Sequence, residues 1–302
     1  MKITKCLFIA LVITAFYPAG AWSADVQQHA PRPGSINYIE GQASIGTLPL
    51  GAASVGTVEL EKGQILTTQA GKVEMLLTPG VFLRLADNSS VKMLSPNLAN
   101  TEVELESGRA IIEAIDLRKE NFIRLDQNGA ISTVVKKGLY EFDADHSQVR
   151  VFDGEIEMQA GIHPVTIKGN HMATIMMEFA PKPQGFETRA YEDEFYRWSA
   201  LRSGYLSEAS IDAARTYIGP GPGLYGPGWG GWGWYWNPWF SVYTFLPANG
   251  VFWSPFGWGF YSPIYVYHSP YFFGFPRPHP FNEFHGPYGH GYGTPRPGVR
   301  RG

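Results

Sequence analysis

Residues 61–94 read EKGQILTTQAGKVEMLLTPGVFLRLADNSSVKML, and their pattern of apolar side chains sets the expected fold class. Apolar positions alternate with more polar neighbours in two runs: Val73, Met75, Leu77 and Val81, Leu83, Leu85. Side chains of an extended chain point alternately to opposite faces, so this spacing predicts two half-buried β-strands. Pro79-Gly80 between the runs and Asp87-Asn88 after them are typical turn pairs. The segment therefore predicts short strands joined by tight turns.

The same pattern continues to about residue 177. Turn signals recur at intervals of about ten residues: Lys62-Gly63, Ser107-Gly108, Asn128-Gly129, Asp153-Gly154 and Lys168-Gly169. Further alternating pairs lie between them: Val103 and Leu105, Ile112 and Ala114, Tyr140 and Phe142, Val149 and Val151, Ile156 and Met158. About a dozen short strands with tight turns predict a sandwich, a barrel or a β-solenoid. Internal self-similarity is too weak to assign a repeat period, so periodicity alone does not choose among these.

Four segments together carry a resemblance to a known family: residues 61–94, VELESGRAIIEA at 103–114, VVKKGLYEFDA at 134–144 and VRVFDGEIEM at 149–158. They resemble the FecR domain, which is found in periplasmic parts of bacterial iron-uptake regulators and in many exported proteins. The resemblance spans roughly residues 35–177 and consists of glycine turns and apolar strands. It implies an all-β, solenoid-like domain that binds other proteins or ligands, and it implies no catalytic residues.

The chain also departs from the regulators of that family. Those regulators place a helical sigma-factor-binding domain before a transmembrane helix, whereas at most about six residues precede the first apolar run here. They also tend to carry a second small mixed domain after the β-domain, where this chain has a helical segment and an aromatic region. We therefore expect an exported β-domain of the same build that does not contact a cytoplasmic sigma factor.

The N-terminus has the three-part layout of a secretory signal peptide. Two lysines precede an apolar run over residues 7–16, and small residues follow it. The run is shorter than the roughly 20 residues that span a bilayer, which favours cleavage over an uncleaved anchor. We assign residues 1–23 to the signal peptide and 24–34 to a linker, and we expect an exported protein of the periplasm or cell surface. The only cysteine, Cys6, lies in the signal, so no disulfide is expected in the mature chain.

The charge balance differs between the two parts of the mature chain. Residues 24–218 carry 18 Lys and Arg against 26 Asp and Glu, which is a net charge of −8. Residues 219–302 carry five charged side chains, with a net charge of +3. Because phosphate binding needs a basic face, the acidic part argues against nucleic acid as a partner.

A helical segment, residues 181–218, is expected after the β-domain at 35–180. Its larger apolar side chains recur three or four positions apart, on one helix face: Tyr191, Phe195, Trp198 and Leu201. Ser203-Gly204 is expected to break or bend the helix, and Ser207 could cap a second short helix. We expect the Trp198 face to pack on the β-domain; the alternative is a partner-binding helix.

The C-terminal 84 residues are rich in Gly, Pro and aromatic side chains. Residues 226–240 read GPGWGGWGWYWNPWF, with five of the nine Trp of the chain in eleven positions. Gly and Pro at this density preclude long helices and interrupt sheets, so residues 219–275 are expected to be largely irregular, with short aromatic strands and turns. Residues 276–302 have few aliphatic side chains and are predicted to be disordered.

Three roles could explain these aromatic side chains. They could stack on sugar rings, lie at a membrane interface, or cover the β-domain as an irregular wrapping. So much apolar surface with few charges favours a contact role over an idle linker. The candidate binding residues are Trp229, Trp232, Trp234, Trp236, Trp239, Trp253 and Trp258.

Two polar groups in the β-domain could carry chemistry. Arg84, Asp87, Asn88 and Ser89 in RLADNSS could converge on a carboxylate or a sugar hydroxyl, although an Asx turn that satisfies its own backbone is favoured. Acidic side chains alternate at positions 141, 143 and 145 and could bind calcium. No EF-hand spacing accompanies them, so a solvated strand face is favoured.

The C-terminal region holds four histidines, His268, His279, His285 and His290, and none has the i, i+4 spacing that would fix two metal ligands on a helix. No nucleophile elbow, phosphate loop or zinc-hydrolase motif occurs either. We therefore assign no catalytic residue, no metal site and no cofactor.

These observations predict a mainly β protein, a FecR-like β-solenoid or sandwich followed by one or two helices and a low-complexity tail. The predicted function is that of a non-enzymatic envelope protein whose β-domain binds or scaffolds a protein or a glycan, with an aromatic-rich contact segment. Partners would be an envelope protein or a polysaccharide, with peripheral contact to a membrane surface as a further option. The alternative is a periplasmic regulatory or sensing module that recognises a receptor or ligand.

Overall fold

The computed structural model describes residues 30–160, 164–176, 181–218 and 230–269. The predictions for the signal peptide, for Trp229 and for the tail at 276–302 lie outside these residues. Strands dominate the described chain, and the expected fold class is confirmed: one large mixed sheet is followed by a long helix and two short hairpins. Within the described part, no helix is long and apolar enough to cross a membrane.

Fifteen strands form the main sheet. In chain order they are β1 (Ile36–Ile45), β2 (Leu48–Pro49), β3 (Ile65–Thr78), β4 (Val81–Leu85), β5 (Ser90–Asn97), β6 (Asn100–Ser107), β7 (Arg109–Ala114), β8 (Phe122–Gln127), β9 (Ala130–Val134), β10 (Gly138–Asp143), β11 (Gln148–Asp153), β12 (Glu155–Gln159), β13 (Pro164–Lys168), β14 (His171–Thr174) and β15 (Gln184–Gly185). Two 3-10 turns accompany them, η1 (Ala52–Ser54) and η2 (Thr188–Tyr191).

The long strand β3 divides the sheet into two halves. Its first residues pair with β5 and its last residues pair with β4, and β1 runs along it. From β3 the order runs outward through β5, β6, β8, β9, β12 and β13 on one side, and through β4, β7, β10, β11, β14 and β15 on the other. The outer strands β13 and β14 contact each other, so the sheet curls back on itself.

The two halves enclose the main apolar core. It contains alternate residues of both halves, such as Val91, Leu105 and Leu125 on one side and Leu83, Ile112 and Phe142 on the other. The period-two pattern of the sequence therefore marks the inward positions correctly. A curled sheet around a shared core corresponds to the sandwich-like alternative among the predicted architectures.

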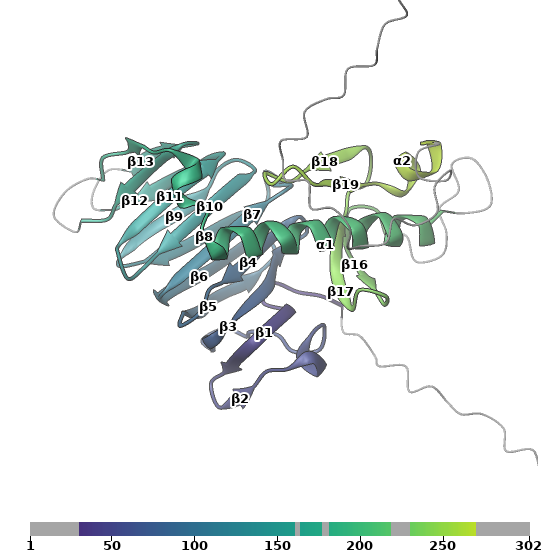
Figure 1. Ribbon diagram of the computed structural model, residues 1–302, viewed down its shortest axis with the longest axis horizontal. Helices are drawn as coiled ribbons and strands as arrows, with labels where there is room; N and C mark the ends of the chain where they lie inside the picture. The colour runs from purple at the N-terminus through teal and green to yellow at the C-terminus, as the bar shows by residue number, and fades with distance from the viewer. Residues whose placement is uncertain (1–29, 161–163, 177–180, 219–229, 270–302) are drawn as a thin grey trace, which may run out of the picture.

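A third layer covers the outer face of the β3–β4–β7–β10 half. Helix α1 (Glu194–Thr216) crosses this face, and the aromatic hairpins lie on either side of the helix in Figure 1. The outward residues Leu76, Phe82 and Ile115 are therefore buried, and they form one cluster with Phe245 and Phe260 from the hairpins. The aromatic segment is thus part of the folded core.

The aromatic segment contains the expected short strands and one helix that was not predicted. Strand β16 (Gly233–Asn237) pairs with β17 (Val242–Leu246), and β18 (Val251–Trp253) pairs with β19 (Gly259–Tyr261). Helix α2 (Pro263–His268) follows, with the Ser262 side chain as its N-terminal cap. Backbone carbonyls of α1 accept hydrogen bonds from the side chains of Asn237 and Thr244. These bonds tie the β16–β17 hairpin to the helix.

The predicted break in the helix at Ser203-Gly204 is wrong. Helix α1 is continuous over 23 residues, and the Asp193 side chain caps it. A Cβ atom on Gly204 would lie 3.1 Å from the Trp258 ring, so this glycine allows close packing and does not end the helix. Ser207 does not cap a second helix, because its hydroxyl donates to the Gly259 carbonyl oxygen. Tertiary packing overrides the local propensity here.

Candidate functional site

A buried ionic layer lies between the sheet and α1. Arg84 is fully buried, with Nε 2.9 Å from Glu74 Oε2 and Nη2 2.7 Å from Glu113 Oε2. Arg202 of α1 reaches the other oxygen of Glu74 at 3.0 Å. The hydroxyls of Ser203 and Ser254 donate to Glu113. Two carboxylates thus face two guanidinium groups, and the layer joins the sheet, the helix and the β18–β19 turn.

The charges in this layer support one another. Burial pushes the pKa of the Glu74 carboxyl up, but Arg202 and Arg84 together outweigh it and hold that pKa below its ordinary value. Desolvation likewise works against the charged form of Arg84, and Glu113 and Glu74 outweigh it and raise its pKa. Both shifts favour the ionised forms of Glu74 and Arg84 in the fold.

The acidic strand positions expected to face solvent are mostly buried, which corrects that prediction. Glu141 is 2% exposed and Asp143 is 3% exposed. Arg109 Nη1 lies 3.1 Å from Glu141 Oε1, and Arg150 Nη1 lies 3.3 Å from the same oxygen. Only Asp145 is exposed, and it accepts a hydrogen bond from the Gly108 backbone. Residues of η2 and α1 cover this face of the sheet, which is why these carboxylates are buried. The period-two pattern of the sequence does not reveal that a second layer covers the face.

The polar group at 84–89 contains the expected turn, but not an Asx turn that satisfies its own backbone: the Asp87 carboxylate pairs with Lys72 at 3.1 Å, and the Ser89 N–H donates to the Thr68 hydroxyl. Asn88 has a φ of +50°, which suits a turn, and the Ser89 hydroxyl donates to the Asp87 carbonyl. Arg84 points instead into the buried ionic layer, so the four side chains do not converge on one ligand. Among the described residues, no group of three or more His, Cys, Asp or Glu side chains is placed to hold a metal ion.

The charge of Asp193 should make stability depend on pH. Burial alone would raise the pKa of this carboxyl, but the Tyr196 N–H and the Arg109 guanidinium outweigh it and hold the pKa below its ordinary value. Such a group stabilises the fold above its unfolded-state pKa of about 3.9, and the contribution is lost as pH falls through the lower folded-state pKa.

We therefore expect Asp193→Asn, which keeps an oxygen for the N-cap, to be less stable than the wild type at about pH 7. The difference should shrink as pH falls below about 4, because the wild-type carboxyl then becomes protonated. Urea unfolding across this pH range measures it. A difference that is constant with pH would contradict the assigned role of the Asp193 charge.

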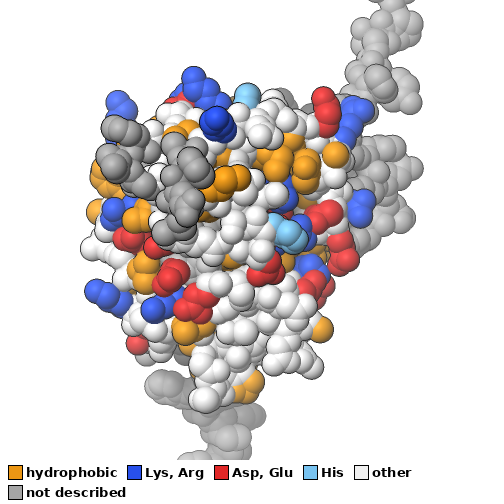
Figure 2. All heavy atoms as spheres, turned by 90° about the vertical axis from the view of Figure 1, so that its left-hand side faces the viewer, with side chains coloured by type: hydrophobic (Ala, Val, Ile, Leu, Met, Phe, Trp, Pro, Cys, Tyr) orange, Lys and Arg blue, Asp and Glu red, His pale blue; other side chains and the backbone are white. Residues whose placement is uncertain are grey.

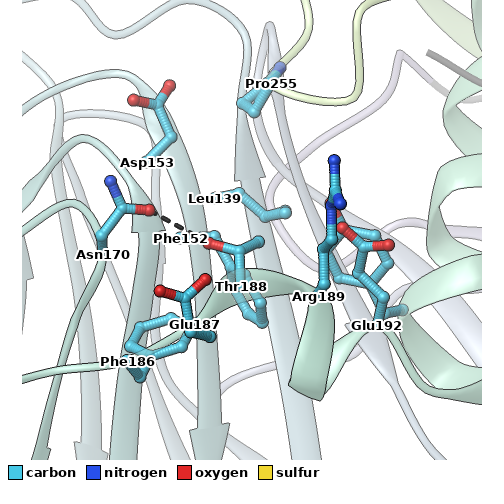
Figure 3. Close-up of a pocket in the computed structure, with 11 residues that line it drawn as sticks. Leu139, Phe152, Asp153, Asn170, Phe186, Glu187, Thr188, Arg189, Glu192 and Pro255 are labelled. Carbon is cyan, nitrogen blue, oxygen red and sulfur yellow. Dashed lines mark hydrogen bonds between the residues drawn. The ribbon is translucent and has the colours of Figure 1, made fainter. Parts of the chain in front are cut away.

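A cleft of about 670 Å³ opens beside η2. Its volume falls within the range of roughly 300–1,000 Å³ that is typical of small-molecule sites. The floor consists of Leu139, Phe152 and Tyr196, and Phe186 packs edge-on against Phe152 with ring centroids 5.4 Å apart. Pro255, from the turn between β18 and β19, lines the cleft on the side away from Phe186 (Figure 3). The β-domain, η2, α1 and the aromatic segment all contribute to this one cleft.

Polar side chains form the rim of the cleft. Asp153, Asn170 and Glu187 lie on one side, and Arg189 and Glu192 lie on the other (Figure 3). The Thr188 hydroxyl donates to Asn170 Oδ1 at 3.0 Å, which fixes η2 against the turn after β13. An aromatic floor with a rim of carboxylate, amide and guanidinium groups can hold a ligand that has both an apolar face and polar edges.

The predicted tryptophans do not share one surface. Trp232, Trp234 and Trp236 are half-buried and pack against the cluster beneath the hairpins. Trp232 Nε1 donates to Asp116 at 2.6 Å, and Arg118 stacks on the Trp232 ring. Three others are more exposed: Trp239 is 77% exposed in the β16–β17 turn, and Trp253 and Trp258 are 58% and 38% exposed at the β18–β19 turn. Whether any of them binds a partner stays a prediction.

The cleft itself was missed from the sequence. Asp153 was interpreted only as part of a turn, and residues 186–192 were assigned to the helical segment. Instead, residues 184–185 form β15 and residues 188–191 form η2. The available signal in the sequence was Phe186 followed by four charged residues within positions 187–193. Of the four histidines, only His268 is described, and it is exposed at the end of α2.

On the face shown in Figure 2, basic and acidic side chains are interspersed. Hydrophobic side chains occur there in small groups between them. That face therefore carries no continuous area of one charge sign.

No family model and no curated protein matches this chain. Two crystal structures of a candidate anti-sigma factor from Parabacteroides distasonis ATCC 8503 are similar to it. One is 13% identical with a TM-score of 0.36, covering 46% of this chain and 64% of the solved chain. The other is 12% identical with a TM-score of 0.35, covering 46% and 63%. The match thus spans less than two thirds of the solved chains, and a likeness of this strength carries no argument about function.

Proposed function

We propose that this protein is a non-enzymatic, exported binding module that holds an envelope glycan in the cleft beside η2. The carrying observation is the combination of an aromatic floor and a polar rim in one cleft, with two exposed tryptophans, Trp253 and Trp258, at the turn that supplies Pro255 to its lining. Export is proposed from the N-terminal signal-like segment.

A glycan suits this cleft for two physical reasons. Sugar rings have apolar faces that pack on aromatic side chains, and Phe186 and Tyr196, both partly exposed in the cleft, offer such surfaces. Sugar hydroxyls need donors and acceptors at the ring edge, and the rim supplies carboxylate, amide and guanidinium groups. Trp253 and Trp258 flank Pro255 in sequence, so a chain longer than one sugar could continue over the β18–β19 turn.

The composition of the cleft offers no hydroxyl, thiol or imidazole catalyst. Its described lining contains no Ser, Cys or His side chain, and we assign its carboxylates, Asp153, Glu187 and Glu192, to ligand binding. The Thr188 hydroxyl is engaged with Asn170. The strongly buried carboxylates of the fold, Glu74, Glu113 and Glu141, are held by arginines outside the cleft.

The test is titration of the whole mature protein with short, soluble hexose and hexosamine oligomers. We expect Trp253→Ala to weaken binding by about two- to tenfold, since one aromatic contact contributes about 0.5–1.5 kcal/mol. The matched variant Trp239→Ala removes an exposed tryptophan of the other hairpin and should bind as the wild type does. Absence of binding to every oligomer would overturn the proposal. Equal losses in both variants would place binding on a wider aromatic surface.

A further inference from the structure

We infer that the cleft selects a glycan that bears free amino groups, that is, protonated hexosamine units. This inference rests on the proposed function and names the ligand class for the same cleft. It is carried by the charge distribution around the aromatic floor. The rim holds three carboxylates, Asp153, Glu187 and Glu192, against one guanidinium, Arg189, which leaves a net charge of −2.

The uncompensated charge is concentrated on one side of the cleft. In Figure 3, Arg189 and Glu192 lie together on one side, while Asp153 and Glu187 lie with Asn170 on the other. Neither Asp153 nor Glu187 forms an ion pair with a described residue. The buried carboxylates Glu74, Glu113 and Glu141, in contrast, all have arginine partners. The side with Asp153 and Glu187 is therefore rich in hydrogen-bond acceptors, and no cation among the described residues pairs with either carboxylate.

An ammonium group matches this side chemically. It carries three N–H donors and no acceptor, so it can bond to the Asp153 or the Glu187 carboxylate. Bonds between charged groups are roughly twice as strong as neutral ones. An N-acetylated amine is neutral and keeps a single N–H donor, so it forms no bond between charged groups here, and a uronic acid would add a further negative charge. The cleft thus favours a free amine over both of these common substituents.

The aromatic floor explains why a sugar, and not a simple amine, is the inferred ligand. Phe186 and Tyr196 present partly exposed rings in the cleft, and the buried Phe152 packs beneath both of them. A hexosamine places its apolar ring face and its ammonium group within one small unit, so it can use both features together. A lysine side chain of a protein partner has the ammonium group but only a thin aliphatic stem, which leaves most of the floor uncovered.

The experiment compares glucosamine oligomers with N-acetylglucosamine oligomers of equal length at about pH 6, where an amino group is protonated. Isothermal titration with the whole mature protein should show about tenfold or greater preference for the free-amine oligomer. The preference should shrink as salt is raised. Asp153→Asn and Glu187→Gln, which keep side-chain shape, should each weaken amine binding by about three- to tenfold and weaken N-acetylated binding less, because only the amine loses a bond between charged groups. Glu61→Gln, an exposed acid outside the cleft, is the charge-matched control.

The outcomes separate this inference from the proposed function. Equal binding of both oligomers would overturn the amine inference and leave glycan binding in place. Binding of neither oligomer would overturn the amine inference, and if the hexose oligomers also failed to bind, the proposed function itself would be overturned. Tighter binding of a lysine-rich peptide than of glucosamine oligomers, lost in Asp153→Asn, would identify a protein partner and overturn the glycan assignment. Circular dichroism of each variant verifies that losses come from the cleft and not from unfolding.

Discussion

An Arg84→Met variant is expected to lose about 3–5 kcal/mol of unfolding free energy, because removing one partner of a buried ion pair leaves the other charge uncompensated. Arg84 lies fully buried between Glu74 and Glu113. Without it, Glu74 keeps Arg202, but Glu113 keeps only the hydroxyls of Ser203 and Ser254. A buried carboxylate without a cation is among the costlier defects in a fold.

Urea unfolding followed by circular dichroism measures this loss. The control is Lys92→Met, whose exposed partner Glu104 lies 3.8 Å away, and its loss should stay below about 1 kcal/mol. A second variant, Arg84→Met combined with Glu113→Gln, removes the unpaired charge and should recover part of the loss. If Arg84→Met were as stable as the control, the ionic layer would not hold the helix on the sheet.

The second large effect is expected in the aromatic segment. Phe245 is fully buried and packs against Phe252, Phe260 and Trp232. It belongs to the same cluster as Leu76 and Phe82 of the main sheet. Phe245→Ala should therefore cost about 3–5 kcal/mol, as is usual for truncating a buried phenylalanine.

This loss should appear in the cooperative unfolding of the sheet itself. Removal of the aromatic segment at 230–269 would uncover Phe82 and leave Glu113 without Ser254, so we expect the sheet to be destabilised without it. Trp239→Ala, at a position 77% exposed, should change stability by less than about 0.5 kcal/mol. A sheet transition unchanged in Phe245→Ala would show that the hairpins are a loose covering after all.

The strands and their inward faces could be predicted because alternation is a local property of the chain. Val81, Leu83 and Leu85 point into the shared core as their spacing indicates. Turn chemistry was equally local, and Asn88 takes the left-handed backbone expected of a turn residue. The cleft could not be predicted in this way, since its lining comes from segments far apart in the chain, from Leu139 to Pro255.

Arg84 shows most clearly where local pattern ends. Its sequence neighbours suggested partners at Asp87 and Asn88, whereas cross-strand register places it opposite Glu74. Alternation does assign Phe82 and Arg84 to the face of β4 that points away from the main core. From the sequence alone, that face is expected to be exposed to solvent. Helix α1 and the aromatic hairpins cover that face and bury both residues. Periodicity determines which side of a strand a residue takes, but only non-local packing determines what lies on that side.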